Sequence, residues 1–180
     1  MAVMDVTLFI PAGAAAVAVI AGITDLRSRR IPNRLTYPGI IGGFGLQAAV
    51  HGWHGLLVAL EGGLLFGGVF LFFHLLHAMG AGDVKLAAAL GCILGPNDSW
   101  QVLFATAMAG GVLAIVVMIF TGRVLQTLRS TLGVAGFHAI HGLRTHPVVN
   151  LDNAAAVRIP YGLAFAAGTL YWAIFMHMWS

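Results

Sequence analysis

Residues 56–78 read LLVALEGGLLFGGVFLFFHLLHA, an apolar stretch with a single charged residue, Glu61. A helix needs roughly 20 apolar residues to cross the hydrocarbon core of a bilayer, so this stretch is long enough to span a membrane. The rest of the chain has the same character: of its 180 residues, 59% are hydrophobic and 8% are charged, and the mean hydropathy is +0.92. Soluble domains carry about 25% charged residues. The composition therefore excludes a soluble globular fold and a disordered chain.

Apolar runs separated by polar or helix-breaking residues predict an all-α fold. We expect one polytopic membrane domain over residues 1–180, a bundle of about six transmembrane helices. The predicted spans are 6–25, 35–50, 56–78, 80–95, 101–121 and 159–179. Pro32 breaks helix continuity between the first two spans, and Asn33 is expected to cap the second. The polar stretch 122–158 has room for an amphipathic helix on the membrane surface.

The glycine pairs in the apolar runs, such as Gly62-Gly63 and Gly67-Gly68, have a structural interpretation. Helices in a bilayer associate by close packing of small residues, so these pairs predict helix–helix contacts. A phosphate-binding loop would need a strand before it and Lys-Ser/Thr after it. The chain offers neither of these.

The Lys and Arg residues predict the orientation. If all six segments cross the membrane, the connections near 26–34, 79–85 and 122–158 share one side, and all nine Lys and Arg residues fall in them. Cytoplasmic loops are enriched in these residues. That side is therefore predicted to be cytoplasmic, with both termini extracytoplasmic.

The numbers and spacing of the basic residues, cysteine and histidines exclude several kinds of site. No basic cluster is long enough to indicate a nucleic-acid surface, and the single Cys92 excludes an intrachain disulfide and a multi-cysteine zinc site. His74 and His77 share a predicted helix face, but no third ligand stands at helical spacing, so we interpret them as interfacial histidines. We predict no metal and no cofactor.

Two acidic residues lie where a membrane protein can least easily hold them. Asp25 ends the first predicted span and Asp83 opens the fourth, so the orientation places both at the cytoplasmic edge of the bilayer. Ionisable groups at such depth are costly and usually have functional partners. The structural alternative is that Asp25 pairs with a nearby Arg while Asp83 only caps the fourth helix.

Two carboxylates that converge on one water molecule can share a proton, because neighbouring like charges do not both ionise readily. One then acts as a base and the other as an acid in peptide hydrolysis. Gly80 and Gly82 lack a Cβ and would let an extended substrate backbone approach. Lys85 is a candidate to stabilise the transition state or an acidic substrate residue, or alternatively a membrane anchor. We expect Asp83, at a helix N-terminus, to be the more often ionised partner.

Three segments carry a resemblance to a known family: Gly80-Ala81-Gly82-Asp83-Val84-Lys85-Leu86, Asp25 with the Arg-Ile-Pro-Asn sequence 30–33 that follows it, and Arg158-Ile159-Pro160-Tyr161-Gly162-Leu163-Ala164. They resemble the motifs of type IV prepilin peptidases, aspartic proteases of the Gly-x-Gly-Asp type embedded in the bacterial inner membrane. The resemblance implies that Asp25 and Asp83 are the catalytic pair. It also makes Gly80, Gly82, Lys85, Pro32 and Asn33 candidate supporting or substrate-binding residues.

The resemblance further implies removal of a short basic leader from prepilins on the cytoplasmic side of the membrane. A prepilin presents this leader in the cytoplasm and an apolar helix in the bilayer. The chain resembles the short peptidases of Flp, or tight-adherence, pilus systems; paired Cys-x-x-Cys motifs are lacking, so N-methyltransferase activity is not expected. The expected partners are a prepilin and membrane lipid, and the oligomeric state is open. The alternatives are an archaeal-type preflagellin peptidase and a non-enzymatic small membrane transporter or assembly subunit.

Overall fold

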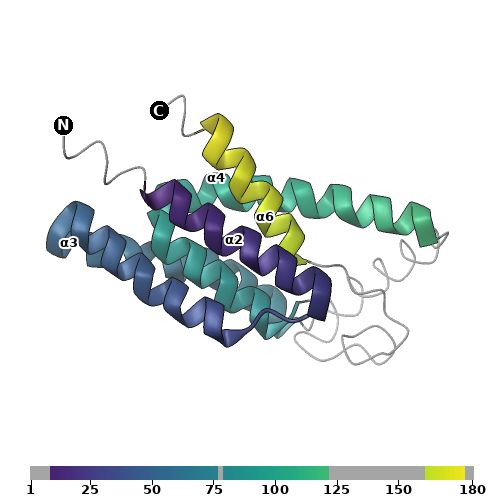
Figure 1. Cartoon of the computed structure of the whole chain (residues 1–180), viewed down its shortest axis with the longest axis horizontal. Coiled ribbons are helices and arrows are strands. Elements are labelled where there is room, and N and C mark those ends of the chain that lie inside the picture. The colour runs from purple at the N-terminus through teal and green to yellow at the C-terminus, as the bar shows by residue number, and fades with distance from the viewer. Residues whose placement is uncertain (1–8, 77–78, 122–160, 177–180) are drawn as a thin grey trace, which may run out of the picture.

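A computed structural model of the chain describes residues 9–76, 79–121 and 161–176. Within these ranges all regular structure is helical, which confirms the predicted all-α class. The elements are α2 (Phe9–Ser28), α3 (Asn33–Leu75), α4 (Ala81–Thr121) and α6 (Tyr161–Tyr171), which continues as a short π-helical segment, Trp172–Met176 (Figure 1). The surface helix predicted in 122–158 lies outside the described residues.

The described residues form four helices and not the predicted six, because α3 and α4 each join two of the predicted spans. Each long helix is interrupted at one glycine: Gly52 has φ 61° and ψ −139°, and Gly95 has φ 77° and ψ 176°. Glycine adopts a positive φ without the steric cost of a Cβ. Each of the predicted gaps, 51–55 and 96–100, is therefore replaced by one non-helical residue: Gly52 inside the first gap and Gly95 directly before the second.

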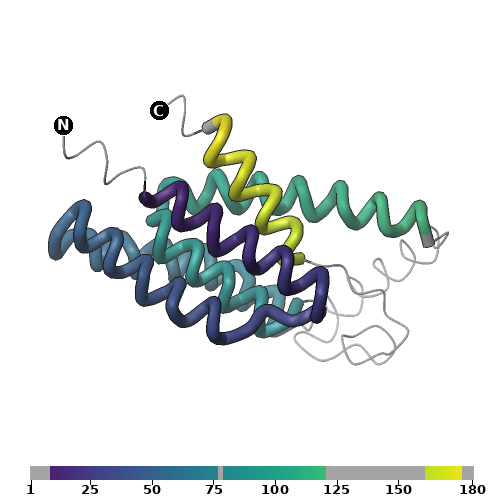
Figure 2. Tube along the Cα trace, viewed as in Figure 1, coloured from purple at the N-terminus to yellow at the C-terminus, as the bar shows by residue number. Residues whose placement is uncertain are grey.

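At these glycines the chain reverses direction, as the trace of α3 and α4 in Figure 2 shows. The backbone carbonyl of Gln47 touches Gly55, although eight residues would separate them by about 12 Å in a straight helix. Carbonyl groups released by the break in α4 find side-chain donors. Gln47 Nε2 donates to Ile93 O at 2.7 Å, and Ser99 Oγ donates to Gly95 O at 2.6 Å. The interrupted helices are thus hydrogen-bonded where they turn.

The second half of α3 packs on the first half of α4 through residues without bulky side chains. Gly62 meets the backbone of Gly91, and a Cβ added to Gly63 would lie 2.6 Å from Cys92 Sγ. A Cβ added to Gly67 would lie 2.9 Å from Ala88 Cβ. These contacts confirm the predicted helix–helix role of the glycines at 62, 63 and 67. Gly68 has no neighbour within 4 Å of the position of a Cβ.

Three aromatic rings join α6 to this pair of helices. Phe165 lies with its ring centroid 5.8 Å from that of Phe66 and 4.8 Å from that of Phe70. The buried side chains of Leu86 and Leu90 from α4 belong to the same core. This core fixes α6 against the long helices, and it thereby positions the start of α6.

The outer surface is apolar. The side chains of Ile41 and Met108 are each 72% exposed, and that of Phe120 is 86% exposed. Exposed apolar surface on this scale is unsuited to water, and the helices Phe9–Ser28, Asn33–Leu75 and Ala81–Phe120 are long and apolar enough to cross a membrane. The structure therefore agrees with the membrane class predicted from composition.

We expect Gly62→Ala to lower the melting temperature of the protein in detergent or lipid. Its Cβ would lie 2.7 Å from the carbonyl carbon of Gly95 as well as against Gly91, and overpacking of this kind costs about 1–3 kcal/mol. Gly68→Ala on the same helix is the matched control, and its melting temperature should stay or rise slightly, because alanine favours a helix over glycine by about 1 kcal/mol. Equal melting temperatures for the two variants would contradict the close contact.

Candidate active site

Asp25 lies in the last turn of α2, and its side chain is buried, with 8% of its surface exposed. It ends the buried face of α2, which begins at Pro11 and continues with small residues: Ala14, Ala18, Ala21 and Gly22. The small face lets α6 come close. A Cβ added to Gly22 would lie 3.1 Å from both Ala166 Cβ and the carbonyl oxygen of residue 162.

The close approach brings a backbone donor to the carboxylate of Asp25. The N–H of Gly162 donates to Asp25 Oδ2 at 2.9 Å in a buried contact. Gly162 is in the first turn of α6, where N–H groups have no partner inside the helix and the helix dipole is positive. A Cβ at position 162 would lie 2.8 Å from Asp25 Cβ. Glycine is therefore the residue that fits this contact.

Asp83 lies in the first turn of α4 and is partly buried. Its Oδ2 accepts the N–H of Gly80 at 3.1 Å, as the third residue of a helix does in a capping box. The structural alternative was therefore right that Asp83 caps the fourth helix. The cap uses one oxygen only, and within the described ranges Oδ1 accepts no hydrogen bond, so the contact leaves an oxygen for chemistry.

The other half of that alternative, an ion pair between Asp25 and an arginine, is absent from the part of the chain that the structure describes. Arg27, Arg29 and Arg30 follow Asp25 closely, but all three are exposed. Asp25 lies in the last turn of α2 and Asp83 in the first turn of α4. The contact of Gly82 with Ile31, in the connection that follows α2, places the two carboxylates at the same end of the bundle.

Both carboxylates accept an N–H at the start of a helix, Asp25 from α6 and Asp83 from α4. The dipole argument that favoured ionised Asp83 therefore applies to Asp25 as well. It does not distinguish the base from the acid.

His74 supports the turn that carries Gly80 and Asp83. Its Nδ1 lies 2.8 Å from the carbonyl oxygen of Met79, and since a carbonyl can only accept, Nδ1 carries the hydrogen. The histidine also acts electrostatically on Asp83. The sequence analysis interpreted it as an interfacial residue only, and the contact with Met79 is a role that it missed.

Lys85 and Asn33 hold the start of α4 to the start of α3. Lys85 Nζ donates to Asn33 Oδ1 at 2.9 Å and lies 5.3 Å from the centre of the Tyr37 ring. The prediction that Asn33 caps its helix was wrong. Pro32 is the N-cap, with φ −74° and ψ 140°, and no side chain completes the cap. Asn33 is already helical, so its side chain is free to bind the lysine.

The two glycines of the motif are close to other parts of the chain. A Cβ on Gly82 would lie 3.3 Å from Ile31 Cβ, in the connection between α2 and α3, and a Cβ on Gly80 would lie 3.2 Å from Asp83 Oδ2. Internal packing thus gives a reason for glycine at both positions beside the predicted approach of a substrate.

The start of α6 supplies two groups to which the sequence analysis gave no role. They are the N–H of Gly162 and the side chain of Tyr161, on which the charge of Asp83 acts. A signal was present, because Pro160 directly before an apolar run is typical of a helix start. Within the described ranges, no three His, Cys, Asp or Glu side chains come together as metal ligands.

The sequence was compared with known families and proteins. The model of the type IV leader peptidase family matches residues 12–115, a segment that contains both Asp25 and Asp83. The chain belongs to the type IV leader peptidase family. This membership confirms the resemblance, implies an aspartic-type peptidase activity, and favours an enzyme over a transporter or assembly subunit. Comparisons with curated proteins and with solved structures found no match.

We expect Gly162→Ala to reduce peptidase activity by about a hundredfold. The added Cβ would displace Asp25, and a misplacement of about 1 Å in a reacting group can cost that much. Peptide cleavage by purified protein in lipid is the measurement. Gly111→Ala on α4 is the control, since a Cβ there would have no neighbour within 4 Å. Normal activity of the Gly162 variant would mean that the contact does not position Asp25.

A second prediction concerns Lys85 and Asn33. Replacing either by alanine should slow cleavage by about fivefold, the equivalent of the roughly 1 kcal/mol that a hydrogen bond contributes. The double variant should be no slower than the worse single variant, because the two side chains act as one contact. Multiplying effects in the double variant would show that they act separately.

Proposed function

We propose that Asp25 and Asp83 are the catalytic pair of an endopeptidase that removes the leader peptide from prepilins, and that residues 1–180 form one transmembrane peptidase domain. The observation that carries the proposal is the geometry of the two acids. They come from the end of α2 and the start of α4, which lie at one end of the bundle, where Gly82 packs against Ile31 and Lys85 binds Asn33. Each is held by a backbone N–H through Oδ2, and among the described residues no donor binds either Oδ1, which leaves that oxygen for water or substrate.

The mechanism follows from the proton that such a pair can share. The ionised carboxylate takes a proton from a water molecule as its oxygen attacks the peptide carbonyl carbon. The protonated carboxyl donates a hydrogen bond to the carbonyl oxygen, which becomes negative in the tetrahedral intermediate. A proton then passes to the leaving nitrogen, and the peptide bond breaks. We assign the two roles to the pair without dividing them between Asp25 and Asp83.

The breaks at Gly52 and Gly95 divide α3 and α4 into two segments each. We propose that these four segments, together with α2 and α6, each cross the inner membrane of a bacterium. Support comes from the end at which the acids lie, because the arginines of 27–34 stand from the end of α2 to the start of α3, and Lys85 binds Asn33 there. By the positive-inside rule this end is cytoplasmic, and both termini are extracytoplasmic. The segment 81–94 is short, about 21 Å long, and local thinning of the bilayer would accommodate it.

The substrate class follows from the depth of the pair. A charged leader in the cytoplasm followed by an apolar helix in the bilayer places the scissile bond at the interface, at the level of Asp25 and Asp83. We propose prepilins of the Flp, or tight-adherence, type as the substrates, in line with the resemblance of the motifs. A preflagellin assayed in parallel would distinguish the archaeal-type alternative.

The test is coexpression with a prepilin, followed by loss of the leader on a gel. Asp25→Asn and Asp83→Asn should each reduce processing by at least about a thousandfold, the scale seen when a catalytic group is removed. Asparagine keeps the size of the side chain and an oxygen acceptor, so both variants should remain in the membrane fraction. Glu61→Gln makes the same kind of change at an exposed carboxylate of α3 and should process normally. Full processing by either aspartate variant would refute the diaspartyl mechanism.

A further inference from the structure

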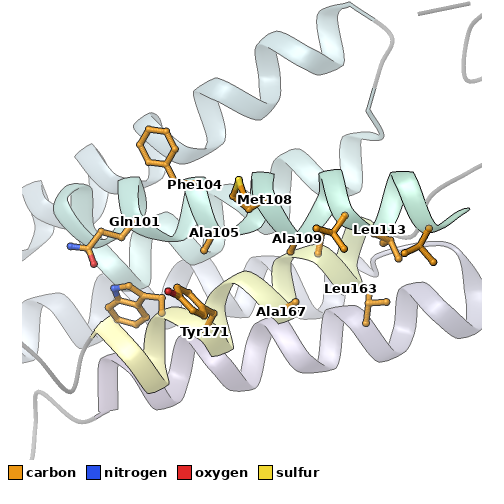
Figure 3. Close-up of a pocket in the computed structure, with 13 residues that line it drawn as sticks. Gln101, Phe104, Ala105, Met108, Ala109, Leu113, Leu163, Ala167 and Tyr171 are labelled. Carbon is orange, nitrogen blue, oxygen red and sulfur yellow. The ribbon is translucent and has the colours of Figure 1, made fainter. Parts of the chain in front are cut away.

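A long apolar groove lies between the second half of α4 and α6 (Figure 3). Its volume is about 820 Å³. Phe104, Met108 and Val112 line it from α4, and Ala167 and Tyr171 line it from α6. None of the described residues that line it is charged. A groove of this composition would take an apolar partner.

One end of the groove adjoins the start of α6, the helix whose first turn binds Asp25. Leu163 lies at one end, directly after the glycine whose N–H holds Asp25, and Gln101 and Tyr171 lie at the other end (Figure 3). Along α4 the lining extends from Gln101 to Val116, about 22 Å at the rise of an α-helix. The groove thus extends from the start of α6, where Gly162 binds Asp25, over a length that is most of the roughly 30 Å hydrocarbon core.

The apolar side chains on the α4 side are largely uncovered. The exposed fractions are 68% for Phe104, 72% for Met108 and 59% for Val112. Within the described ranges no other helix packs over them. Small residues on both walls, Ala105 and Ala167 among them, would let another helix approach closely, as small faces do in membrane bundles.

We propose that this groove binds the apolar helix of the substrate, with the N-terminal end of that helix at the aspartate pair. The proposal rests on the proposed function and adds where the part of the substrate after the scissile bond lies. The dimensions agree. An α-helix about 10 Å across and 22 Å long occupies roughly 1,700 Å³, so a groove of about 820 Å³ takes the half that faces the enzyme and leaves the other half in lipid.

The position of one end of the groove beside Gly162, the residue that binds Asp25, is what selects this occupant. A helix lying in the groove reaches Leu163 at the point where its preceding residues must become extended for cleavage, beside Gly162 and Asp25. The groove then fixes the depth and direction of the substrate helix, and the two aspartates cleave the peptide bond in the extended segment that precedes this helix. A lipid chain or a second copy of the protein would gain nothing from this alignment.

Photo-cross-linking tests the occupant directly. A photoreactive amino acid replaces Phe104 in the Asp83→Asn background, so that uncleaved prepilin stays bound in lipid vesicles. Leu64 of α3, 66% exposed against 68% for Phe104, carries the same probe as the matched control. We expect a prepilin adduct at 104 and none at 64. Adducts at 104 with lipid only, or with a second copy of the chain, would overturn the proposal.

Kinetics tests what the groove contributes. The purified enzyme in vesicles is given a full prepilin and a shortened peptide that ends a few residues after the cleavage site. Ala167→Trp fills the groove, and we expect its kcat/KM for the full prepilin to fall by about tenfold or more, chiefly through KM, a common scale for altered apolar pocket contacts. Cleavage of the shortened peptide should be unchanged.

The control for this experiment is Ile41→Trp, which adds the same ring to an exposed apolar position of α3. It should leave both substrates unaffected. Equal rates for the full prepilin in the wild-type and Ala167→Trp enzymes, or equal losses for both substrates, would overturn the groove proposal. The proposed function fails separately, if the wild type cleaves no prepilin or if the aspartate variants still do.

Discussion

The hydrogen bond from the N–H of Gly162 to Asp25 Oδ2 joins the last described helix to the first. At the edge of a bilayer, a helix-start N–H without a partner and a buried carboxylate without a donor are both costly, and here each satisfies the other. The bond forms because the two helices approach closely: a Cβ added to Gly22 would lie 3.1 Å from Ala166 Cβ, a tight contact. The orientation of the carboxylate therefore depends on two features together: the small residues on the buried face of α2 and the position at which α6 begins.

The second carboxylate reaches the same place through the reversal at Gly52. A straight helix over Asn33–Leu75 would hold its ends about 63 Å apart, too far for the start of α3 to meet the start of α4. In the structure Lys85 binds Asn33 across that junction. Positive φ at one residue thus returns the chain to the end it left and brings Asp83 to Asp25.

The sequence was most informative about the features that the surrounding bilayer determines. Apolar runs and the positions of the Lys and Arg residues predicted a helical membrane protein with Asp25 and Asp83 at one end, because hydrocarbon tolerates few arrangements of charge. What it missed are pairings between distant residues, such as Gly162 with Asp25 and Lys85 with Asn33. No local pattern encodes a partner that is 137 or 52 residues away. The merged helices were missed because a glycine pattern does not show which glycine will take a positive φ.

The donors around the two acids also bear on their chemistry. A buried arginine paired with either carboxylate would hold it as a fully neutralised anion and weaken it as a base. A backbone N–H at a helix start offers a partial positive charge of about half a unit at most, enough to orient an oxygen and to offset part of the cost of its charge. Among the described residues each carboxylate has one such donor, an arrangement that suits the proposed mechanism, in which one acid would activate water while the other polarises the carbonyl.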